Sequence, residues 1–579
     1  MANKRIADIF TEMSYIIGLE NGPTAKFEVR AYENAALTLS TTQEDVESIY
    51  AKGGVAALMQ LPGIGKGLAL KIEEYLKTGK ISKYEQLKEK YPIDFKGLTG
   101  IEGLGPKRIF ELYKKLGIKN LGDLKEALSK HSIRSLDGFG EKSEELLSAG
   151  LAATESMGRR MLLGDALPVA ETIAEKIRSS GLAEKVVIAG SARRMRETVG
   201  DLDILAISDK GREVMDMFTS LSEVAGIVAK CPTKSTVRLN IGITCDLRVI
   251  NATDKNFGAA LQYFTGGKEH NVAVRTIAVQ KGYKLNEYGL FKGKKEVAVP
   301  SGSEEEVYAA LGMDWIPPEM RENRGEIALA QKRMLPKLID LSDIQGDLHS
   351  HTKETDGINT LEEMADAAIK SGHKYIAVTN HTKSLKVANG MNERQFKEFF
   401  RRMDILEVKL EGKIRLFKGA EVDILKDGKL DLDNPTLSGM DCVVAAVHSS
   451  FKMPEKEMTE RIVRALDSGL VHILAHPTGR LINGREGYKV DLDKVAEAAE
   501  RNGVALEINC WPNRLDLNDT NIMKVSKYKV MFAIDTDSHN TSNFEFMRYG
   551  VGTARRGWVE KKRVINAMDK DGVEKFLKR

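Results

Sequence analysis

The sequence Gly190-Ser-Ala-Arg-Arg-Met-Arg-Glu-Thr-Val-Gly-Asp-Leu-Asp203 decides the fold of the central part of the chain. The run Val186-Val-Ile-Ala-Gly190 predicts a strand that ends at Gly190 and Ser191, and Leu202-Asp-Ile-Leu-Ala-Ile207 predicts a second strand. Where the first strand ends, Ser191 and the N-terminus of a following helix can hold phosphate oxygens. Arg194 can add a bidentate contact. The stretch therefore indicates a strand-turn-helix that binds phosphate.

Two carboxylates, Asp201 and Asp203, lie one residue apart on the second strand, so both point to one face. Adjacent like charges are unfavourable unless a cation neutralises them, and Mg²⁺ prefers oxygen ligands. Asp246, in Cys245-Asp-Leu-Arg-Val-Ile250, is a third acid on another strand. A lone Asp-x-Asp is usually a solvated strand face. The nearby Gly-Ser, the arginine pair and the third acid favour a two-metal site for phosphoryl transfer, in which the metals activate a 3′-hydroxyl and support a pyrophosphate leaving group.

The N-terminal 150 residues consist of helical patterns separated by glycine-containing turns. Three turns, Leu61-Pro-Gly-Ile-Gly-Lys66, Leu98-Thr-Gly-Ile-Glu-Gly-Leu-Gly105 and Leu136-Asp-Gly-Phe-Gly-Glu141, each precede a predicted helix. Two glycines permit a tight turn that brings backbone N–H groups close to an anion. One copy could be only a structural turn, but repetition favours helix-hairpin-helix binding of DNA phosphates. The predicted DNA contacts are Gly63, Gly65, Lys66, Gly103 and Gly105.

Eight of the ten histidines lie between His349 and His539. In this part, short apolar strands alternate with helical patterns, which predicts βα units in a barrel or an open sheet. In a βα barrel the carboxyl ends of the strands converge on one rim, so side chains there can meet at a metal. His373 and His472 are expected in the core or on the surface. The candidate ligands at strand ends are His349, His351, Asp356, His381, Glu421, His448, His476, Asp537 and His539.

The composition of the 579 residues excludes several classes of protein. Lys and Arg total 87 against 83 Asp and Glu, a formal charge of +4, which excludes a simple polycationic DNA-coating protein. Four cysteines without a C-x-x-C pair argue against a disulfide framework or zinc knuckle. No secretory apolar core and no apolar run of about 18 residues is present. We therefore expect a soluble protein of about four domains in a reducing compartment.

The central motifs closely resemble the nucleotidyltransferase palm of family X DNA polymerases. The resemblance continues through Leu261-Gln-Tyr-Phe-Thr-Gly-Gly-Lys-Glu-His-Asn271, Arg275 and Leu285-Asn-Glu-Tyr288, although Gly267 stands where Ser is expected. It implies that Asp201, Asp203 and Asp246 bind Mg²⁺ or Mn²⁺ for catalysis. Of the nucleotide contacts, Tyr263, Phe264 and Gly266 would line the sugar, Asn271 would contact the incoming base and Arg275 the template. The implied nucleotide-binding residues are Arg160, Gly190, Ser191, Arg194, Gly200, Tyr263, Phe264, Gly266, Asn271 and Arg275.

The same family implies a Schiff-base lysine in the N-terminal domain. Lys71, on the helix after the first hairpin, is at the matching position. A desolvated lysine among cations can be a nucleophile at neutral pH. However, Phe27, Glu28 and Gly67 stand where a lyase-proficient relative has basic residues, so a phosphate-binding or surface role for Lys71 remains equally open.

The histidine-rich part resembles the polymerase and histidinol phosphatase (PHP) domain, a distorted (βα)₇ barrel with up to three Zn²⁺, Mn²⁺ or Fe ions. All nine ligand positions of that pattern are filled here. Asn380 replaces the commoner Asp before His381, which affects a hydrogen bond and not a ligand. Arg480, after His476-Pro, is either a substrate-phosphate contact or a surface arginine. The implied chemistry is metal-hydroxide attack on a phosphoester.

The expected architecture is a multidomain α and α/β protein, with a charged helical connector from Glu319 to Ile339. The resemblance implies a gap-filling polymerase of base excision repair with 3′–5′ exonuclease and abasic-site (AP) endonuclease activities. Alternatives are a PHP phosphoesterase with a polymerase relic, or a polymerase whose PHP domain is only structural. We expect a cytoplasmic, nucleoid-associated monomer that binds gapped or primer-template DNA and dNTPs and no membrane. The expected domains are a helical lyase-like domain (1–90), a fingers-like domain (91–150), the palm (151–262), the thumb (263–318), a linker (319–345) and the PHP domain (346–579).

Overall fold

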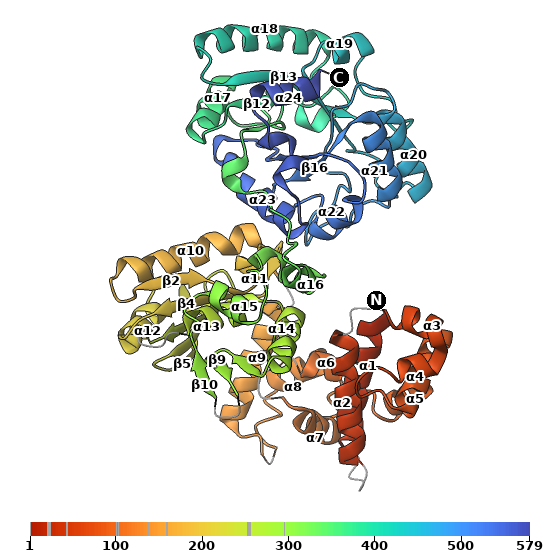
Figure 1. The fold of residues 1–579 in the computed structure, drawn as a ribbon, viewed down its shortest axis with the longest axis vertical. Coiled ribbons are helices and arrows are strands. Elements are labelled where there is room, and N and C mark those ends of the chain that lie inside the picture. Colours follow the sequence, from red (N-terminus) through yellow and green to blue (C-terminus); the bar gives the residue numbers. More distant parts are fainter. Residues whose placement is uncertain are drawn as a thin grey trace. The chain divides into compact units, whose positions relative to one another are not determined.

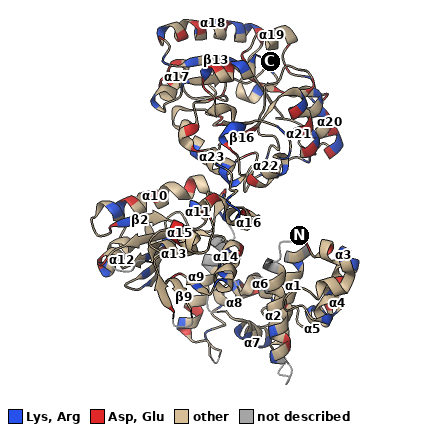
Figure 2. Cartoon of the chain, viewed as in Figure 1, with Lys and Arg blue, Asp and Glu red and all other residues tan. Residues whose placement is uncertain are grey.

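The computed structural model describes residues 2–578 except 20–24, 42–44, 100, 102–103, 137, 158–159, 252–255 and 294–295. The chain forms two compact units. The first comprises Met1–Arg160 with Asn271–Thr276, and the second comprises Met161–His270 with Ile277–Arg579. Among the described residues, no helix combines the length and the apolar character needed to cross a bilayer. Lys and Arg alternate with Asp and Glu along the helices, for example on α18 and α20 (Figure 2), so the near-zero net charge is a local mixture.

The first unit is helical, as predicted, and each glycine hairpin leads directly into a helix. Its apolar core includes Phe10 and Tyr32, whose rings meet edge to face at 5.4 Å. Gly79 and Gly117 end two of the helices in the left-handed conformation that glycine favours. The helices are α1 (Ala2–Ile17), α2 (Ala25–Thr41), α3 (Val46–Leu58), α4 (Lys66–Thr78), α5 (Ser82–Lys90), α6 (Phe95–Leu98), α7 (Pro106–Leu116), α8 (Leu121–Ser129) and α9 (Glu141–Met157).

The second unit begins with a mixed five-stranded sheet in the order β2-β4-β7-β6-β5. Strands β4 and β7 are parallel, and the other neighbours are antiparallel. Helices α10 and α12 contribute Ala170, Ile173 and Phe218 to the core of this region. The bounds are β1 (Met161–Leu162), α10 (Leu163–Ser179), β2 (Lys185–Ile188), α11 (Gly190–Arg193), β3 (Thr198–Val199), β4 (Asp201–Ile207), α12 (Gly211–Thr219), β5 (Val224–Lys230), β6 (Lys234–Leu239) and β7 (Thr244–Ile250).

Three helices and a small antiparallel sheet follow, and with the mixed sheet they form what we call the central region (residues 161–318). Helix α13 packs against α15 and against β9. The small sheet has the order β10-β9-β8. The elements are α13 (Phe257–Thr265), α14 (Lys268–Gln280), β8 (Tyr283–Asn286), β9 (Gly289–Lys292), β10 (Val297–Val299) and α15 (Glu304–Ala310).

The predicted helical connector from Glu319 to Ile339 is wrong. Only η1 (Pro318–Met320) and α16 (Glu326–Gln331) are helical within it. Arg321 and Glu326 are fully buried, because Glu304 pairs with the first and His270 contacts the second at 2.6 Å. Charges that suggested a helical connector thus have protein partners from other elements of the fold.

Seven parallel strands form the C-terminal barrel (residues 346–577), in the order β11 to β17. The barrel is completed by a parallel bridge between Ser350 and Ser538, where the His351 amide donates to the Ser538 carbonyl at 2.7 Å. Helices such as α18, α20 and α22 lie on the outer side of the strands (Figure 1). The alternation of strands and helices predicted from the sequence is confirmed.

Except for the half-buried Arg415 and Lys418, the strand residues of the barrel are buried, and they are rich in apolar residues, as parallel strands covered on both faces require. They are β11 (Gly346–Asp347), β12 (Tyr375–Val378), β13 (Arg415–Asp423), β14 (Cys442–Ala446), β15 (Ile473–Leu474), β16 (Ala505–Asn509) and β17 (Phe532–Asp535). The α-helices are α17 (Leu361–Lys370), α18 (Glu393–Lys409), α19 (Asn434–Ser438), α20 (Glu455–Leu466), α21 (Leu492–Asn502), α22 (Asp519–Val525), α23 (Met547–Arg556) and α24 (Lys570–Leu577). The short 3₁₀ turns are η2 (Leu341–Asp343), η3 (Lys386–Ala388), η4 (Thr541–Phe546), η5 (Lys561–Arg563) and η6 (Ile565–Ala567).

Candidate metal centres

The three acids of the central region meet on two neighbouring parallel strands. Asp203 on β4 stands in register with Asp246 on β7, and Asp201 begins β4. Asp246 accepts a hydrogen bond from the Thr236 hydroxyl at 2.6 Å and pairs with Lys234 at 3.1 Å. Burial, together with the charges of Asp201 and Asp246, raises the pKa of Asp203 to about 7. Because these carboxylates repel one another, a divalent cation with oxygen preference fits the site.

Gly190 allows the phosphate-binding turn to approach the acids. Its φ is +63°, and a Cβ at this position would lie 2.2 Å from Asp203 Oδ2. Strand β2 ends at Ile188, two residues before the predicted end, and α11 begins at Gly190. Among the described residues, the buried Ser191 hydroxyl has no hydrogen-bond partner, so it can donate a hydrogen bond to a phosphate oxygen of a ligand.

The two arginines of the turn have partners of their own. Arg193 pairs with Glu304 at 2.7 Å. Arg194 is largely buried, and its Nε donates to Glu322 at 3.0 Å while its NH1 donates to the Thr265 carbonyl at 2.7 Å. The arginine predicted to bind phosphate is therefore held from both sides before any nucleotide arrives.

The residues predicted to line the sugar are at the end of α13. The rings of Tyr263 and Phe264 meet edge to face at 5.1 Å, and the guanidinium of Arg248 lies 4.4 Å from the centre of the Phe264 ring. Gly266 is the C-cap residue of α13. The remaining predicted nucleotide contacts lie just before β4, on α14, or in the first unit; they are Gly200, Asn271, Arg275 and the exposed Arg160.

The first hairpin has the geometry of a phosphate-binding turn. Gly63 has a φ of +76°, Gly65 is the N-cap residue of α4, and Lys66 is exposed at the start of that helix. In the second hairpin Gly105 is the N-cap residue of α7. Gly103 lies outside the described residues.

Lys71 lies on α4, the helix after the first hairpin, and is half-buried. Its Nζ donates to the Gly67 carbonyl at 3.2 Å. Burial and the nearby charge of Lys83 lower the pKa of Lys71. Glu28, one of the departures from the family pattern, pairs with Lys83. The local chemistry is compatible with a nucleophile, and the lyase role stays a prediction.

All nine predicted ligands of the barrel come together at the carboxyl ends of its strands. Glu421, 1 % exposed, lies at the centre. Its Oε2 is 3.0 Å from His381, and its Oε1 is 3.0 Å from His476 and 3.2 Å from His448. The nitrogens of His349 and His351 are 3.3 and 3.5 Å from the same side chain. One carboxylate cannot accept hydrogen bonds from five imidazoles, but Glu421 and these imidazoles could together hold metal ions.

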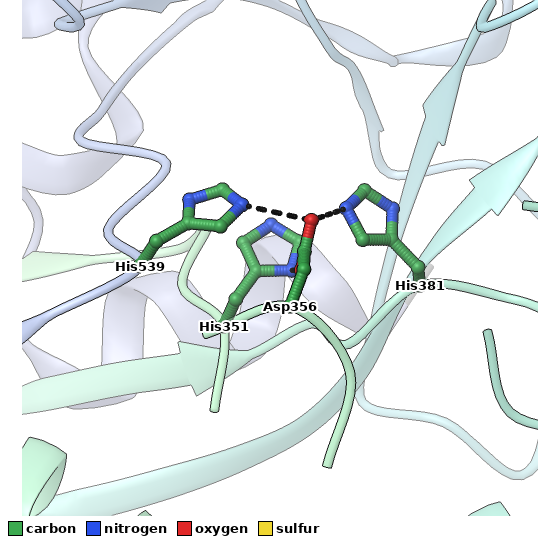
Figure 3. A group of neighbouring side chains, drawn as sticks. All are labelled: His351, Asp356, His381 and His539. Atoms are coloured by element: carbon green, nitrogen blue, oxygen red, sulfur yellow. Dashed lines mark ion pairs between the residues drawn. The ribbon is translucent and has the colours of Figure 1, made fainter. Parts of the chain in front are cut away.

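A second carboxylate, Asp356, lies between the rings of His381 and His539, 3.3 Å from each, with His351 beside it (Figure 3). Asp537 is 3.1 Å from His351. Three groups of donors can each hold a metal ion, and they share members. The groups are His351, Asp356, His381 and His539; His349, His351, Glu421 and Asp537; and His381, Glu421 and His448.

The charges of this histidine cluster, and a buried nitrogen that lacks a hydrogen bond among the described residues, favour the binding of metal cations. The buried Nε2 of His349 makes no hydrogen bond to any described residue, although Asp537 is 3.5 Å away. Burial and the neighbouring His539 and His381 lower the pKa of His351 to about 3. Against the effect of burial, Glu421 and Asp356 raise the pKa of His381 to about 10. The carboxylates around His381 therefore favour a positive charge there, which a metal ion would supply in place of the proton. Imidazoles without that proton and carboxylates at these spacings are the donors that Zn²⁺, Mn²⁺ and Fe accept.

Two acids that orient the ligands were not predicted. Glu507, on β16, lies 2.6 Å from His349 Nδ1 and accepts from the His476 amide at 2.6 Å. Asp423, on β13, lies 2.9 Å from His448 Nδ1. Such partners fix which ring nitrogen faces the metal. The signal was present: Glu507 is the one acid in the apolar run Val504-Ala-Leu-Glu-Ile508.

Other predictions for this part have clear outcomes. His373 packs against Phe544 at 5.6 Å, and the His472 ring accepts from the Val443 amide, so both are structural as expected. Asn380 accepts hydrogen bonds from Thr352 and Thr355, which shape the loop before Asp356.

Arg480, one of whose two predicted roles was a substrate-phosphate contact, is engaged within the protein. It pairs with Glu197 at 2.6 Å and donates to the Leu515 carbonyl at 2.7 Å. Its side chain is 14 % exposed, so Arg480 is not a freely solvated surface arginine, and the substrate-phosphate contact stays a prediction.

Comparison with known proteins agrees with this arrangement. Family models match at residues 1–81 (helix-hairpin-helix domain), 95–152 (SAM-like helix-hairpin-helix tandem), 260–322 (DNA polymerase beta thumb) and 347–510 (PHP domain). The chain is 39% identical over 553 residues to the DNA polymerase/3′-5′ exonuclease PolX of Bacillus subtilis, covering 96% of this chain and 95% of that one.

Proteins named as probable phosphatases match a part of the chain. A protein of Citrobacter koseri named "Probable phosphatase" is 33% identical over 167 residues, which cover 28% of this chain and 63% of that one. One from a Thermoanaerobacter species is 26% identical over 243 residues, which cover 40% of this chain and 94% of that one. The full-length match, the thumb model and the PHP model together show that the chain belongs to the family X DNA polymerases that carry a C-terminal PHP domain.

Proposed function

We propose that the chain is a DNA-directed DNA polymerase that fills short gaps during base excision repair, with Asp201, Asp203 and Asp246 as its catalytic metal ligands. The observation that carries this proposal is the register of Asp203 with Asp246 on adjacent parallel strands, beside a glycine that leaves room for the phosphate-binding turn. The raised pKa of Asp203 supports the proposal, because it reflects repulsion among the acids that a bound Mg²⁺ or Mn²⁺ would relieve. Bound there, such ions supply activation of the primer hydroxyl and charge neutralisation at phosphorus.

The protein's own residues bind and orient the nucleotide. Ser191 offers a free hydroxyl and Arg194 a fixed guanidinium to the triphosphate of a dNTP. The Tyr263 and Phe264 rings, with the backbone at Gly266, form a wall for the sugar that disfavours a 2′-hydroxyl. Asn271 and Arg275, on α14, would contact the incoming base and the template strand.

The glycine hairpins bind the DNA backbone in this proposal. Gly63, Gly65, Lys66, Gly103 and Gly105 would hold phosphates of gapped or primer-template DNA without reading its sequence. We also propose the division into lyase-like, fingers-like, palm, thumb, linker and PHP domains that the family resemblance implies. The chain would act as a monomer.

The barrel would hydrolyse phosphodiester bonds of DNA, as a 3′–5′ exonuclease and at abasic sites. The three overlapping donor groups around Glu421 support a centre of up to three Zn²⁺, Mn²⁺ or Fe ions, which supply a hydroxide nucleophile when bound. Glu507 and Asp423 would hold the rings of His349 and His448 in the orientation that such a centre needs.

The test is a one-nucleotide-gapped duplex incubated with and without dNTPs, in Mg²⁺ and in Mn²⁺. The double variant Asp201→Ala/Asp203→Ala is expected to lose extension and keep 3′ trimming. His349→Ala is expected to show the reverse and to retain less metal by elemental analysis. Extension by the double aspartate variant would refute the polymerase site. Unchanged trimming by the metal-depleted His349 variant would show that the barrel is only structural, and a wild type that trims but never extends would identify a phosphoesterase with a polymerase relic.

A further inference from the structure

The strongest unexplained feature of the second unit is a buried cluster of charges that joins the phosphate-binding turn to the barrel. Its centre is Glu322, which follows η1 and is 9 % exposed. Oε1 of Glu322 accepts from Arg194 Nε and from Arg556 NH1, each at 3.0 Å. Oε2 accepts from Arg196 at 3.2 Å. One carboxylate thus holds three guanidinium groups, two from the central region and one from the barrel.

Within the cluster, both the side chain and the backbone of Arg194 accept or donate hydrogen bonds. Arg556, the last residue of α23, donates to the backbone carbonyl of Arg194 at 2.9 Å as well as to Glu322. Glu322 therefore holds the guanidinium of Arg194. Arg556 in turn holds the backbone of Arg194 and the carboxylate of Glu322. With Nε and NH1 bonded, Arg194 retains NH2, which has no hydrogen-bond partner among the described residues.

The barrel anchors Arg556 on its other side. Arg556 NH2 donates to Asp519 at 2.6 Å, and Arg324 pairs with the same Asp519 oxygen at 3.0 Å. The side chain of Arg556 is only 5 % exposed. Although burial opposes ionisation, Arg194, Arg556 and Arg196 lower the pKa of Glu322 to about 2, so the carboxylate is charged at neutral pH.

Gly267 explains how Glu322 comes so close. Its amide donates to the Arg321 carbonyl at 3.0 Å. A Cβ at this position would lie 2.9 Å from that carbonyl and 3.1 Å from Glu322 Oε2. The glycine that replaces the Ser expected from the family pattern therefore gives space to the segment that carries Glu322.

We propose that Glu322 is a positioning residue for nucleotide addition, and that Arg556 of the barrel holds Glu322 so that Arg194 presents its free NH2 to the triphosphate of the incoming nucleotide. The proposal rests on the proposed function, because it takes Arg194 as a triphosphate contact. A free arginine side chain has several rotatable bonds, and fixing it in advance removes an entropic cost of binding. The PHP barrel would thus contribute to the polymerase site through a side chain, in addition to its own hydrolytic centre.

The experiment measures KM for dNTP and kcat separately on a one-nucleotide-gapped duplex, for Arg194→Ala, Glu322→Gln and Arg556→Met in the full-length protein. Each variant is expected to raise KM about tenfold or more, the change expected when a charge-assisted hydrogen bond is lost. DNA affinity and 3′–5′ trimming are expected to stay at the wild-type level. Glu322→Gln in the Arg194→Ala background is expected to have no further effect on KM.

Arg555→Met is the matched control. Arg555 precedes Arg556 on α23 and pairs with Glu319 at 2.6 Å, so it also joins the barrel to the segment after the central region, without contacting Arg194 or Glu322. Its KM for dNTP is expected to be unchanged.

The outcomes separate the two proposals. If Arg194→Ala leaves KM unchanged, the assignment of Arg194 as a triphosphate contact is wrong. If Arg194→Ala raises KM and Glu322→Gln lowers it, Glu322 competes with the triphosphate and the positioning role is refuted. An unchanged KM in Glu322→Gln, or an equal increase in Arg555→Met, refutes it as well. Should Glu322→Gln not fold, Arg556→Met alone decides between these outcomes.

Discussion

Gly190→Ala provides the sharpest test of the central site, because the substitution has two effects that the structure allows us to estimate. The first is backbone strain: Gly190 has a φ of +63°, and a residue with a Cβ pays about 1–2 kcal/mol in this left-handed conformation. The second is a collision, because the new Cβ would lie 2.2 Å from Asp203 Oδ2. To restore an ordinary contact, the carboxylate must move by about 1 Å, a displacement that can reduce a reaction rate about a hundredfold.

Gly242 is the matched control for the strain. It lies in the turn between β6 and β7 with a φ of +92°, and a Cβ there would meet no heavy atom within 4 Å. Gly242→Ala therefore carries the backbone cost without the collision. Both variants are expected to lose about 1–2 kcal/mol of unfolding free energy from the backbone term.

The assay is single-nucleotide incorporation on a gapped duplex in Mg²⁺, with 3′ trimming of the same DNA as an internal standard. For Gly190→Ala we expect kcat/KM for incorporation to fall about a hundredfold. Gly242→Ala is expected to keep both activities. Incorporation by Gly190→Ala within a few-fold of wild type would refute the reasoning, as would an equal loss in Gly242→Ala.

Three further predictions concern other parts of the molecule. Glu507→Gln weakens the partner of His349 Nδ1, so metal retained after dialysis against a chelator series should reflect about 10–100-fold lower affinity. Although burial opposes it, Arg321 and Arg193 lower the pKa of Glu304 from 4.5 to about 2, so its stabilisation of roughly 3 kcal/mol is present above pH 4.5 and is lost as the pH falls towards 2. The difference in urea-unfolding free energy between wild type and Glu304→Gln should therefore be largest near neutral pH and shrink below pH 4.5; a constant difference would contradict this. Lys66→Ala should weaken binding of all duplex sequences alike and reduce the slope of log affinity against log salt by about 1, as fluorescence anisotropy in a salt series would show.

The sequence alone was enough to predict that the candidate ligands of the barrel lie at the ends of its strands. His381, His448 and His476 each follow an apolar run that predicts a buried strand, and parallel strands bring their carboxyl ends to one rim. The same short-range logic placed Asp201 and Asp203 on one strand. The position of a side chain can be predicted from the sequence when it depends only on the alternation within a strand or on the distance from a strand end.

Ion-pair partners were not predictable in this way. The stretch Glu319 to Ile339 was expected to be a charged helical connector, but Arg321 and Glu326 are buried and have Glu304 and His270 as partners. Likewise Arg194 was expected to make a bidentate contact with phosphate, and its Nε is bonded to Glu322, 128 residues further along the chain.

The sequence by itself determined the two chemistries, an acidic strand pair and a histidine-rich rim, since both depend on residues close together in the chain or at equivalent strand ends. Only the tertiary structure decided how the acidic site is supported. Arg556, 362 residues after Arg194, donates to its backbone. The physical reason is that the partner of a buried charge is the opposite charge that packing brings within hydrogen-bond distance, and local sequence pattern carries no information about that neighbour.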